Sequence, residues 1–460
     1  MATAPQPTLE QLDRAHLIHP ITELRIHEVK GPRVIVGGKG IRLETADGRS
    51  IIDGFSGLFN INVGHGRTEI ADAVAEQMRK MPYYPSFWDF SNEPAIRLGE
   101  RLAGLFPADR ELDHFLFTTG GSDANETNFR TARLYHAVRG DHERKKVLSR
   151  RWSYHGITRA AGSATTLPAY HAFYEPEPNF VPTSMPYCFR CEFKKNPPDC
   201  DLLCANDVEE VIKREGPETV AAVIAEPVQG TGGILVPPPD YFEGLREICD
   251  RHGVLLIFDE VVSGFGRLGT MFGYEHWKVQ ADIYTFAKGL ASGYMPIGAT
   301  VVKEHIFEKF EGAPSEMKHF RQINTFGGHP VASAVALKAI QIVEEEKLAE
   351  NADTVGTYMR HKFMELLADH PYVGEIRGKG MIMGIELVAD RKTKAPLSDD
   401  KVMGIVGACV QKGVILGRNS NTIPGRCNVL LIAPPLILTK AQADRIVETV
   451  TTAMAMAIQK

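Results

Sequence analysis

Four groups of residues that can take part in catalysis or ligand binding each follow a short apolar segment. They are Gly120-Gly121-Ser122 after Phe115–Thr118, Glu226 after Val220–Ala225, Asp259-Glu260 after Val254–Phe258, and Lys288 just after Ile283–Phe286. Apolar runs of this length are typical of buried strands. The carboxyl ends of parallel strands meet at one edge of a sheet, where open α/β sheets bind ligands. The sequence therefore predicts one site that contains a glycine turn, carboxylates and a lysine.

Lys288 is the most reactive candidate. It lies in the segment TFAKGLASGYMPIGA, in which most residues are small or apolar. Burial among such residues lowers the pKa of a lysine and favours the neutral amine, which is the nucleophile that forms a Schiff base with an aldehyde. The alternative is a structural lysine whose aliphatic stem extends to the surface.

The glycine turn and Asp259 suit two different parts of a ligand. Gly120-Gly121-Ser122-Asp123 opens an expected helix, and the free N–H groups of a helix N-terminus favour a phosphate. The alternative is a plain turn in which Ser122 or Asp123 is the N-cap. Asp259 ends a buried strand, so its carboxylate must be paired, hydrogen-bonded or protonated. It can hold a protonated ring nitrogen, or it can belong to a structural ion pair or cap.

The order of the elements predicts an α/β fold with a mostly parallel sheet that is covered by helices on both faces. Apolar strands alternate with amphipathic helices in the middle of the chain. We expect one helix at about Asp123–Val138 and a second helix beside a capping box formed by Asp207 and Glu210. A third helix is expected at Tyr241–His252, with Gly253 as its left-handed cap.

Smaller units are expected at both ends of the chain. At the N-terminal end we expect a polar arm over residues 1–20, followed by a strand meander between Arg33 and Ile52. The C-terminal elements are a helix at Ala332–Glu345, strands at Gly384–Leu387 and Gly413–Leu416, and a last helix after Thr439. The predicted division is residues 1–70 for the arm and meander, 71–330 for a large ligand-binding domain, and 331–460 for a small α+β domain.

The composition excludes several classes of protein. The chain has 460 residues, of which 43% are hydrophobic and 24% charged, as in an ordinary globular protein. A formal net charge of −5 gives no strong electrostatic attraction to nucleic acid or to an anionic membrane. The sequence shows neither an apolar run of membrane-spanning length nor a secretory signal, so we expect a cytoplasmic protein. Seven cysteines, an odd number, argue against a disulfide framework.

Two further patterns resemble binding motifs. Gly264–Gly269 fits G-x-G-x-x-G, but it lies five residues past its strand and no helical pattern follows, so we do not expect dinucleotide binding there. The spacing of four cysteines is compatible with a structural zinc site or with four reduced thiols, and no metal is expected in the catalytic site. These cysteines are Cys188, Cys191, Cys200 and Cys204.

Taken together, these residues resemble the class III pyridoxal-phosphate-dependent aminotransferases of fold type I, the omega-transaminase group. The resemblance covers nearly the whole chain. Its seven blocks, in order, are DGFSGLFNINVGHGR, TTGGSDANETNFR, SYHGITRAAGSATTLP, AEPVQGTGGILVPP, FDEVVSGFGRLG, FAKGLASGYMPIGA and NTFGGHPVA.

The resemblance implies roles for individual residues. Lys288 forms the Schiff base with pyridoxal 5'-phosphate and then acts as general base and acid. Asp259 pairs with the pyridine nitrogen, so that the ring withdraws electrons. The other implied cofactor-binding residues are Val261 and Tyr154 on the two ring faces, Gly121 and Ser122 at the phosphate, Thr325 contributed by a partner subunit, and Glu226 near the ring. The resemblance thus implies a homodimer or homotetramer with its active site at the dimer interface.

The substrates are implied less specifically. The resemblance implies ping-pong transfer of an amino group from an ω-amino compound, such as taurine, β-alanine, a diamine or a simple amine, to pyruvate. Phe59 and Trp88 would line the pocket, and Arg418 would bind the pyruvate carboxylate. The segment after Arg418 is longer than in many relatives, so Arg426 competes for that role, and its form looks most like the taurine–pyruvate branch.

Three other functions stay open at this stage. Class III relatives also include decarboxylating and aminomutase enzymes, which use the same lysine. A nicotinamide-dependent oxidoreductase would need an acidic strand-end residue about 20 positions after its glycine motif, whereas Asp282 precedes its strand. A binding protein with a vestigial site is disfavoured because Lys288, Asp259 and Gly121-Ser122 are all present.

Overall fold

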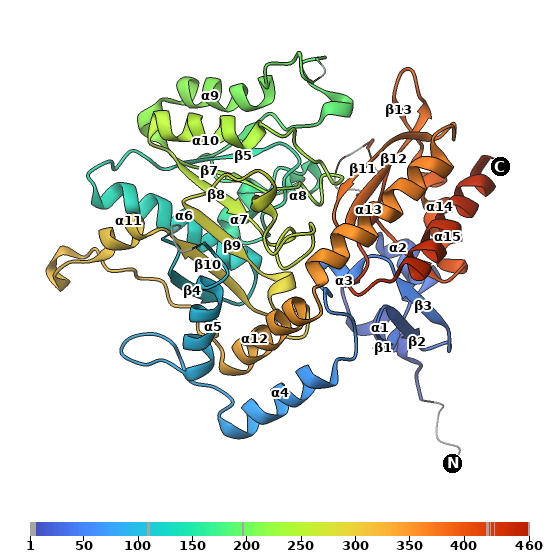
Figure 1. The fold of residues 1–460 in the computed structure, drawn as a ribbon, viewed down its shortest axis with the longest axis horizontal. Coiled ribbons are helices and arrows are strands. Elements are labelled where there is room, and N and C mark those ends of the chain that lie inside the picture. The colour runs from blue at the N-terminus through green and yellow to red at the C-terminus, as the bar shows by residue number, and fades with distance from the viewer. Residues whose placement is uncertain are drawn as a thin grey trace.

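A seven-stranded sheet forms the centre of the computed structural model, which describes residues 6–107, 111–195, 197–419, 423, 425–426 and 428–458. The strand order is β4-β10-β9-β8-β7-β5-β6, and β10 runs antiparallel to both of its neighbours while the other pairs are parallel. The strands are β4 (His114–Thr118), β5 (Lys146–Arg150), β6 (Phe180–Thr183), β7 (Val220–Ala225), β8 (Leu255–Asp259), β9 (Ile283–Phe286) and β10 (Gly298–Val302). The prediction of a mostly parallel sheet is confirmed (Figure 1).

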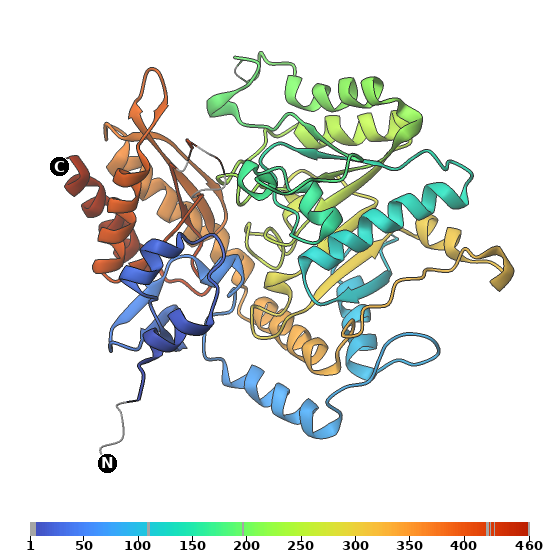
Figure 2. The same cartoon turned by 180° about the vertical axis from the view of Figure 1, so that it is seen from behind.

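Helices cover both faces of this sheet (Figures 1 and 2). Ala222 and Ile224 of β7 pack with one set of helices, and Val223 packs with the other, because successive side chains of a strand point to opposite faces. The first set is α6 (Gly121–Val138) and α7 (Arg159–Ala164), and the second includes α9 (Leu203–Glu215) and α10 (Tyr241–His252). The remaining helices of this part are α4 (Thr68–Lys80), α5 (Glu93–Ala103), α8 (Pro168–His171), α11 (Glu304–Phe307) and α12 (Pro330–Glu345).

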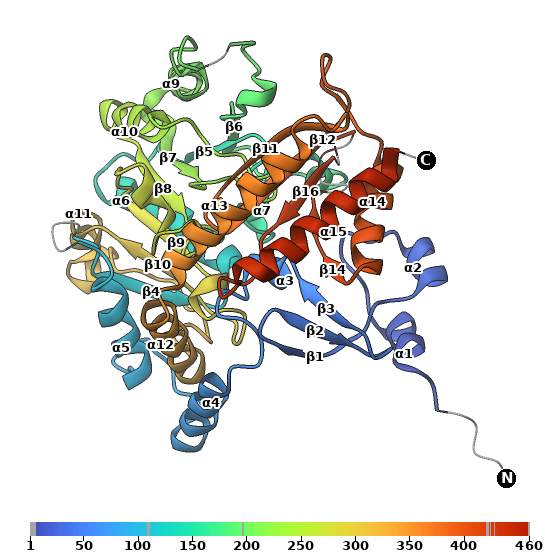
Figure 3. The same cartoon turned by 45° about the vertical axis from the view of Figure 1, so that its right-hand side comes forward.

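Two smaller sheets pack beside the central one (Figure 3). The first joins both ends of the chain, because β14 (Val414–Ile415) pairs in parallel with β3 (Ser50–Asp53) next to β2 (Arg42–Thr45) and β1 (Ile35–Lys39). The second contains β11 (Val373–Lys379), β12 (Ile382–Asp390), β16 (Val429–Ile432) and β15 (Gly417–Arg418), with β13 (Ala395–Pro396) paired to β12. Their helices are α1 (Leu9–His16), α2 (Leu24–Lys30), α3 (Ser56–Phe59), α13 (Leu348–Leu367), α14 (Asp399–Gln411) and α15 (Lys440–Ile458). We propose that the large domain covers about residues 71–330, between an N-terminal unit (1–70) and a small C-terminal domain (331–460).

Several predicted element boundaries are correct, one helix start is wrong, and the predicted arm contains a helix. α10 ends at His252, its C-cap Gly253 is left-handed (φ 62°), and Thr439 caps the last helix. The helix near Asp207 begins at Leu203, so Asp207 lies inside the helix and is not its N-cap. The Asp207 carboxylate accepts the N–H of Ser184 instead. The arm expected over residues 1–20 contains a helix, α1, with a Thr8–Gln11 capping box. None of the helices in the described ranges is long and apolar enough to span a membrane.

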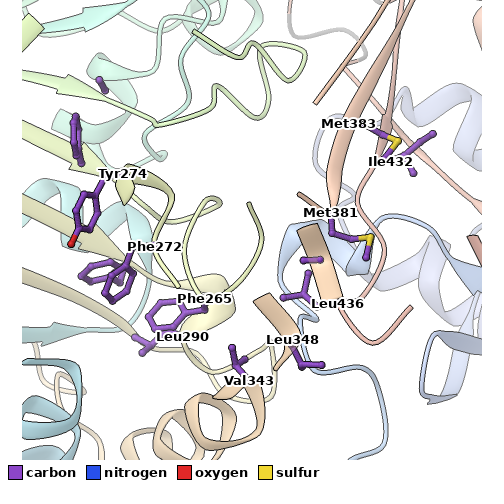
Figure 4. Packing of buried hydrophobic residues seen from close by; sticks show 14 of the residues in the cluster. Phe265, Phe272, Tyr274, Leu290, Val343, Leu348, Met381, Met383, Ile432 and Leu436 are labelled. Carbon is purple, nitrogen blue, oxygen red and sulfur yellow. The ribbon is translucent and has the colours of Figure 1, made fainter. Parts of the chain in front are cut away.

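One hydrophobic cluster and one arginine join the central and smaller parts. The cluster extends from Phe265 and Phe272, beside the central sheet, to Met381 in the turn between β11 and β12 and to Ile432 in β16 (Figure 4). Arg267, inside the G-x-G-x-x-G pattern, is fully buried. Its guanidinium donates to the carbonyl oxygens of Met381 (3.0 Å) and Pro434 (2.6 Å), and to Ser56 Oγ (3.2 Å) and Asn62 Oδ1 (2.8 Å). This cluster and the arginine's hydrogen bonds hold the parts in a fixed relation.

We expect Arg267→Leu to lower the free energy of unfolding by about 3 kcal/mol, because it leaves buried acceptors without a donor. Chemical denaturation followed by circular dichroism measures the change. Arg445→Leu is the control: this arginine is 52% exposed on α15, and its pair with Glu448 should contribute less than about 1 kcal/mol. Equal stability of the two variants would contradict the joining role.

Candidate active site

The carboxyl edge of the central sheet opens into a cavity of about 480 Å³. Residues 58–60 of the N-terminal part form another part of its wall. The cavity is lined by eight of the residues singled out from the sequence: Phe59, Gly121, Ser122, Tyr154, Glu226, Asp259, Val261 and Lys288. These residues come from segments up to 229 positions apart (288 − 59), and the parallel strands bring them to one edge.

Asp259 is buried at the end of β8 and is held by three donors. His155 Nδ1 lies 2.7 Å from Oδ2, and Asn125 Nδ2 donates to the same oxygen over 2.8 Å. The N–H of Val261 donates to Oδ1 over 3.1 Å. Thr285 in turn donates to Asn125 Oδ1. These three hydrogen bonds fix the orientation of the carboxyl group at the wall of the cavity.

His155 and Asn125 were missed by the sequence reasoning. They are 104 and 134 positions from Asp259, so no local pattern connects them to it. One signal was available for Asn125: it lies three residues after Ser122 in a helix, and positions three apart lie on the same helix face. His155 is adjacent to Tyr154 in the SYHG block.

Lys288 begins a short 3-10 turn after β9, with φ of +36°. Burial lowers its pKa, while the charges of Asp259 and Glu226 act in the opposite direction. Its Nζ lies 5.6 Å from the centre of the Phe59 ring. Within the described part of the chain, this nitrogen has no hydrogen-bond or ion-pair partner. Lys288 thus provides an amine whose charged form is disfavoured and which has no structural hydrogen bond to satisfy.

The first turn of α6 lines the cavity and has no side-chain cap. Its N-cap position is Gly120, and no side chain caps it, so the alternative of a capped turn is wrong. The Asp123 carboxylate instead accepts from Thr119 N, Thr119 Oγ1 and Asn324 Nδ2, at 2.7 Å each. Ser122 Oγ accepts the N–H of Ile157 over 3.2 Å. Uncapped N–H groups at the start of a long helix form a favourable anion site.

Glu226 and Tyr154 line the same cavity as Asp259. Glu226 accepts the N–H groups of Gly230 (2.9 Å) and Tyr154 (3.3 Å), and burial raises its pKa. Burial also raises the pKa of Tyr154 to about 12, so its phenol stays neutral. The Tyr154 ring packs edge-on against Tyr170, with centroids 5.5 Å apart.

Three of the residues singled out from the sequence do not line this cavity in a single chain. Thr325 is exposed, and its carbonyl accepts a hydrogen bond from Tyr83. Trp88 is 76% exposed, so the expectation that it lines the pocket is not met within one subunit. Arg418 is paired with Asp399. The competing Arg426 lies over the Trp152 ring at 5.9 Å, and its Nη1 is buried without a hydrogen-bond partner in the described residues.

The residues of the two other sequence patterns do not line this cavity. Gly266 in the G-x-G-x-x-G segment packs against the C-terminal part: a Cβ there would lie 2.8 Å from Leu436 Cδ1. Turns follow it instead of a helix. The four cysteines are free thiols, and no three of their sulfur atoms lie within 4.8 Å of one another in the described chain.

Comparison with known proteins identifies the class to which this fold and site belong. The aminotransferase class-III family model matches residues 26–454. The chain is 44% identical to aminotransferase YhxA of Bacillus subtilis over 90% of this chain and 89% of that protein. It is 39% identical to a taurine–pyruvate aminotransferase of Rhodobacter capsulatus over 96% and 95% of the two chains. The chain therefore belongs to the class III aminotransferases.

Solved structures agree with this assignment. A Bacillus anthracis aminotransferase superimposes with a TM-score of 0.92 at 40% identity, over 97% of this chain and 98% of that chain. An omega transaminase from Pseudomonas jessenii, solved in complex with PMP, gives 0.93 at 34% identity over 98% and 99%. The protein is an aminotransferase with fold type I architecture.

Proposed function

We propose that this protein transfers an amino group from an ω-amino compound to pyruvate with bound pyridoxal 5'-phosphate, in a ping-pong reaction. The observation that carries the proposal is the arrangement in one cavity of Lys288, Asp259 and the uncapped start of α6. These groups supply an amine, a fixed carboxylate and an anion site. An aldehyde-bearing pyridine phosphate has the three matching groups.

The cavity fits this cofactor. Lys288 Nζ, which has no partner in the described chain, would bind the aldehyde covalently. Asp259 would face the ring nitrogen, and the N–H groups near Gly121 and Ser122 would hold the phosphate. Gly121 has no room for a side chain, because a Cβ would lie 2.9 Å from Val261 Cγ2. Once bound, the cofactor supplies a ring that withdraws electrons from the carbon bearing the amine.

The protein's own residues would then position groups and move one proton. Hydrogen bonds with His155, Asn125 and Val261 hold the Asp259 carboxyl group in a fixed position. The lowered pKa of Lys288 lets its Nζ take a proton from the substrate carbon and return it nearby. Phe59, which is 3% exposed, covers one side of Nζ and limits the access of water.

We expect Gly121→Ala to weaken binding of pyridoxal 5'-phosphate by about 1 to 3 kcal/mol, because the added methyl group displaces Val261 or the phosphate-binding turn. Absorbance titration of the apo-enzyme with the cofactor measures the dissociation constant. Gly407→Ala is the matched control, since nothing lies within 4 Å of that added Cβ on α14. An unchanged dissociation constant in Gly121→Ala would contradict this assignment of the phosphate site.

Relatives support the donor and acceptor classes in this proposal. Two of them are named for pyruvate with taurine or with hypotaurine and taurine, and another is a putrescine–pyruvate aminotransferase. A 37% identical relative is a diaminobutyrate–2-oxoglutarate transaminase. All these donors carry an amino group remote from an acid group or at the end of a chain. We propose a homodimer or homotetramer, in which exposed Thr325 serves the site of a partner subunit.

A donor and acceptor panel tests this function. Holoenzyme is incubated with taurine, β-alanine, putrescine or 1-phenylethylamine, and with either pyruvate or 2-oxoglutarate. We expect alanine to form with at least one of these donors, and glutamate to form more slowly. Release of carbon dioxide, or isomerisation of an amine without a keto acid, would instead establish a decarboxylase or an aminomutase.

A single arginine is expected to control the affinity for pyruvate. Arg418→Ala should raise KM for pyruvate by about 10- to 100-fold, because the variant loses the charged hydrogen bonds between the guanidinium and the pyruvate carboxylate. The effect on KM for a simple amine should be smaller. The pair with Asp399 must open for this role. Arg426→Ala is the comparison, because its Nη1 has no partner in the described chain. If only Arg426→Ala raises this KM, the assignment moves to Arg426.

A further inference from the structure

The N-terminal helices α1 and α2 lack a hydrophobic core of their own. They have eight and seven residues, and neither contains a buried residue. Helices this short are not stable in isolation. Both helices lie at the outer edge of the small part, near the N-terminal sheet (Figure 3). Some other interaction must therefore hold them together.

Asp13 of α1, His19 of the connecting segment and His27 of α2 meet at one point. His19 Nε2 lies 2.9 Å from Asp13 Oδ1, and His27 Nε2 lies 3.1 Å from the same oxygen. The two imidazole rings are 4.2 Å apart between centroids. The side chains are 32%, 10% and 14% exposed for His19, His27 and Asp13, respectively. Solvent ions can thus reach a partly buried cluster that offers two nitrogens and one oxygen.

We propose that Asp13, His19 and His27 bind one Zn²⁺ ion that ties α1 to α2. Zinc takes imidazole nitrogen and carboxylate oxygen at about 2.0–2.2 Å, so two ligands at 90° to 110° lie about 2.9–3.5 Å apart. The separations of 2.9 and 3.1 Å already lie in this range, and the three donor atoms are all within 4.8 Å of one another. Water would complete the coordination. Within the described residues, this is the one cluster of at least three such groups with this spacing.

The donor chemistry selects zinc over the hard cations. Ca²⁺ and Mg²⁺ prefer oxygen ligands, whereas two of the three donors here are imidazole nitrogens. Binding requires the Nε2 lone pairs, so each neutral imidazole carries its proton on Nδ1 in the bound form. No oxidation or covalent step is involved. The site is structural and separate from the cavity around Lys288, which none of the three residues lines.

The test measures Zn²⁺ binding to the full-length holoenzyme after treatment with a chelator. Isothermal titration with ZnCl₂, followed by metal analysis of the dialysed protein, gives affinity and stoichiometry. We expect one Zn²⁺ per chain in the parent, and a dissociation constant raised about 100-fold or more in His19→Ala, His27→Ala and Asp13→Asn. His16→Ala is the matched control, because His16 lies on α1 outside the cluster. Cys188→Ser controls for binding by thiols.

A second measurement separates loss of the metal from loss of the fold. Limited proteolysis of the parent should show that ZnCl₂ protects the segment around residues 13–27 from cleavage, with no such protection in His27→Ala. Circular dichroism checks that the variants are folded. The proposal is overturned if the parent binds no Zn²⁺, if Cys188→Ser abolishes binding, or if the three cluster variants bind as tightly as His16→Ala.

Discussion

Lys288→Ala is expected to reduce kcat by about 10⁴-fold or more, because it removes both the nucleophile that binds the cofactor and the group that moves the proton. The variant should fold. Burial lowers the pKa of Lys288, and its Nζ makes no hydrogen bond in the described chain, so the substitution removes no stabilising partner. Initial rates with the best donor and pyruvate, together with the melting temperature and the cofactor content, give the result.

Lys303→Ala is the control for Lys288→Ala. Lys303 is 21% exposed and faces Asp282 at 3.9 Å, outside the cavity. It should retain nearly full activity. A Lys288→Ala protein that keeps more than about 1% of the parent kcat would refute the catalytic assignment, because acid–base catalysis alone is worth about 10²–10⁴-fold.

Asp259→Asn should lower kcat/KM by about 10³-fold, which corresponds to about 4 kcal/mol in the barrier. The amide has nearly the same size but carries no charge, so it cannot keep a ring nitrogen protonated. It also disturbs the hydrogen bonds with His155 and Asn125. Steady-state kinetics measures the loss, and a cofactor titration shows how much of it comes from weaker binding.

Asp282→Asn is the matched control for the charge. Asp282 is another buried carboxylate at the edge of the sheet, but it pairs with Arg246 at 2.8 Å and accepts the N–H of Leu256. Its substitution should reduce the melting temperature and leave kcat/KM within about threefold. Equal losses of kcat/KM in the two variants would mean that Asp259 has a structural role only.

The central fold was predictable because its local signals agree with its tertiary structure. Val220–Ala225, Tyr241–His252 and Ile283–Phe286 have the same bounds in the sequence interpretation and in the structure. A strand that is buried on both faces is apolar throughout, so its ends are easy to locate. The site then follows from strand order, since parallel strands bring Glu226 and Asp259 to one edge.

Other parts of the site depend on contacts that the sequence does not specify. The hydrogen bonds of Asp259 join segments more than 100 residues apart, as for His155 at a separation of 104. Trp88 and Thr325 do not line the cavity of this chain, so no contact within the described residues supports the roles that the resemblance implies. The helix near Asp207 was misplaced because the Asp207 side chain binds Ser184 instead of capping its own helix.

The most direct test of the central claim is the visible absorption spectrum of the purified protein, recorded before and after addition of amines without a keto acid. A yellow band that disappears with taurine, β-alanine or a diamine, and returns with pyruvate, is the expected result. Its absence from Lys288→Ala would place the band on that lysine. A protein that shows no band even after addition of pyridoxal 5'-phosphate would contradict the proposed function.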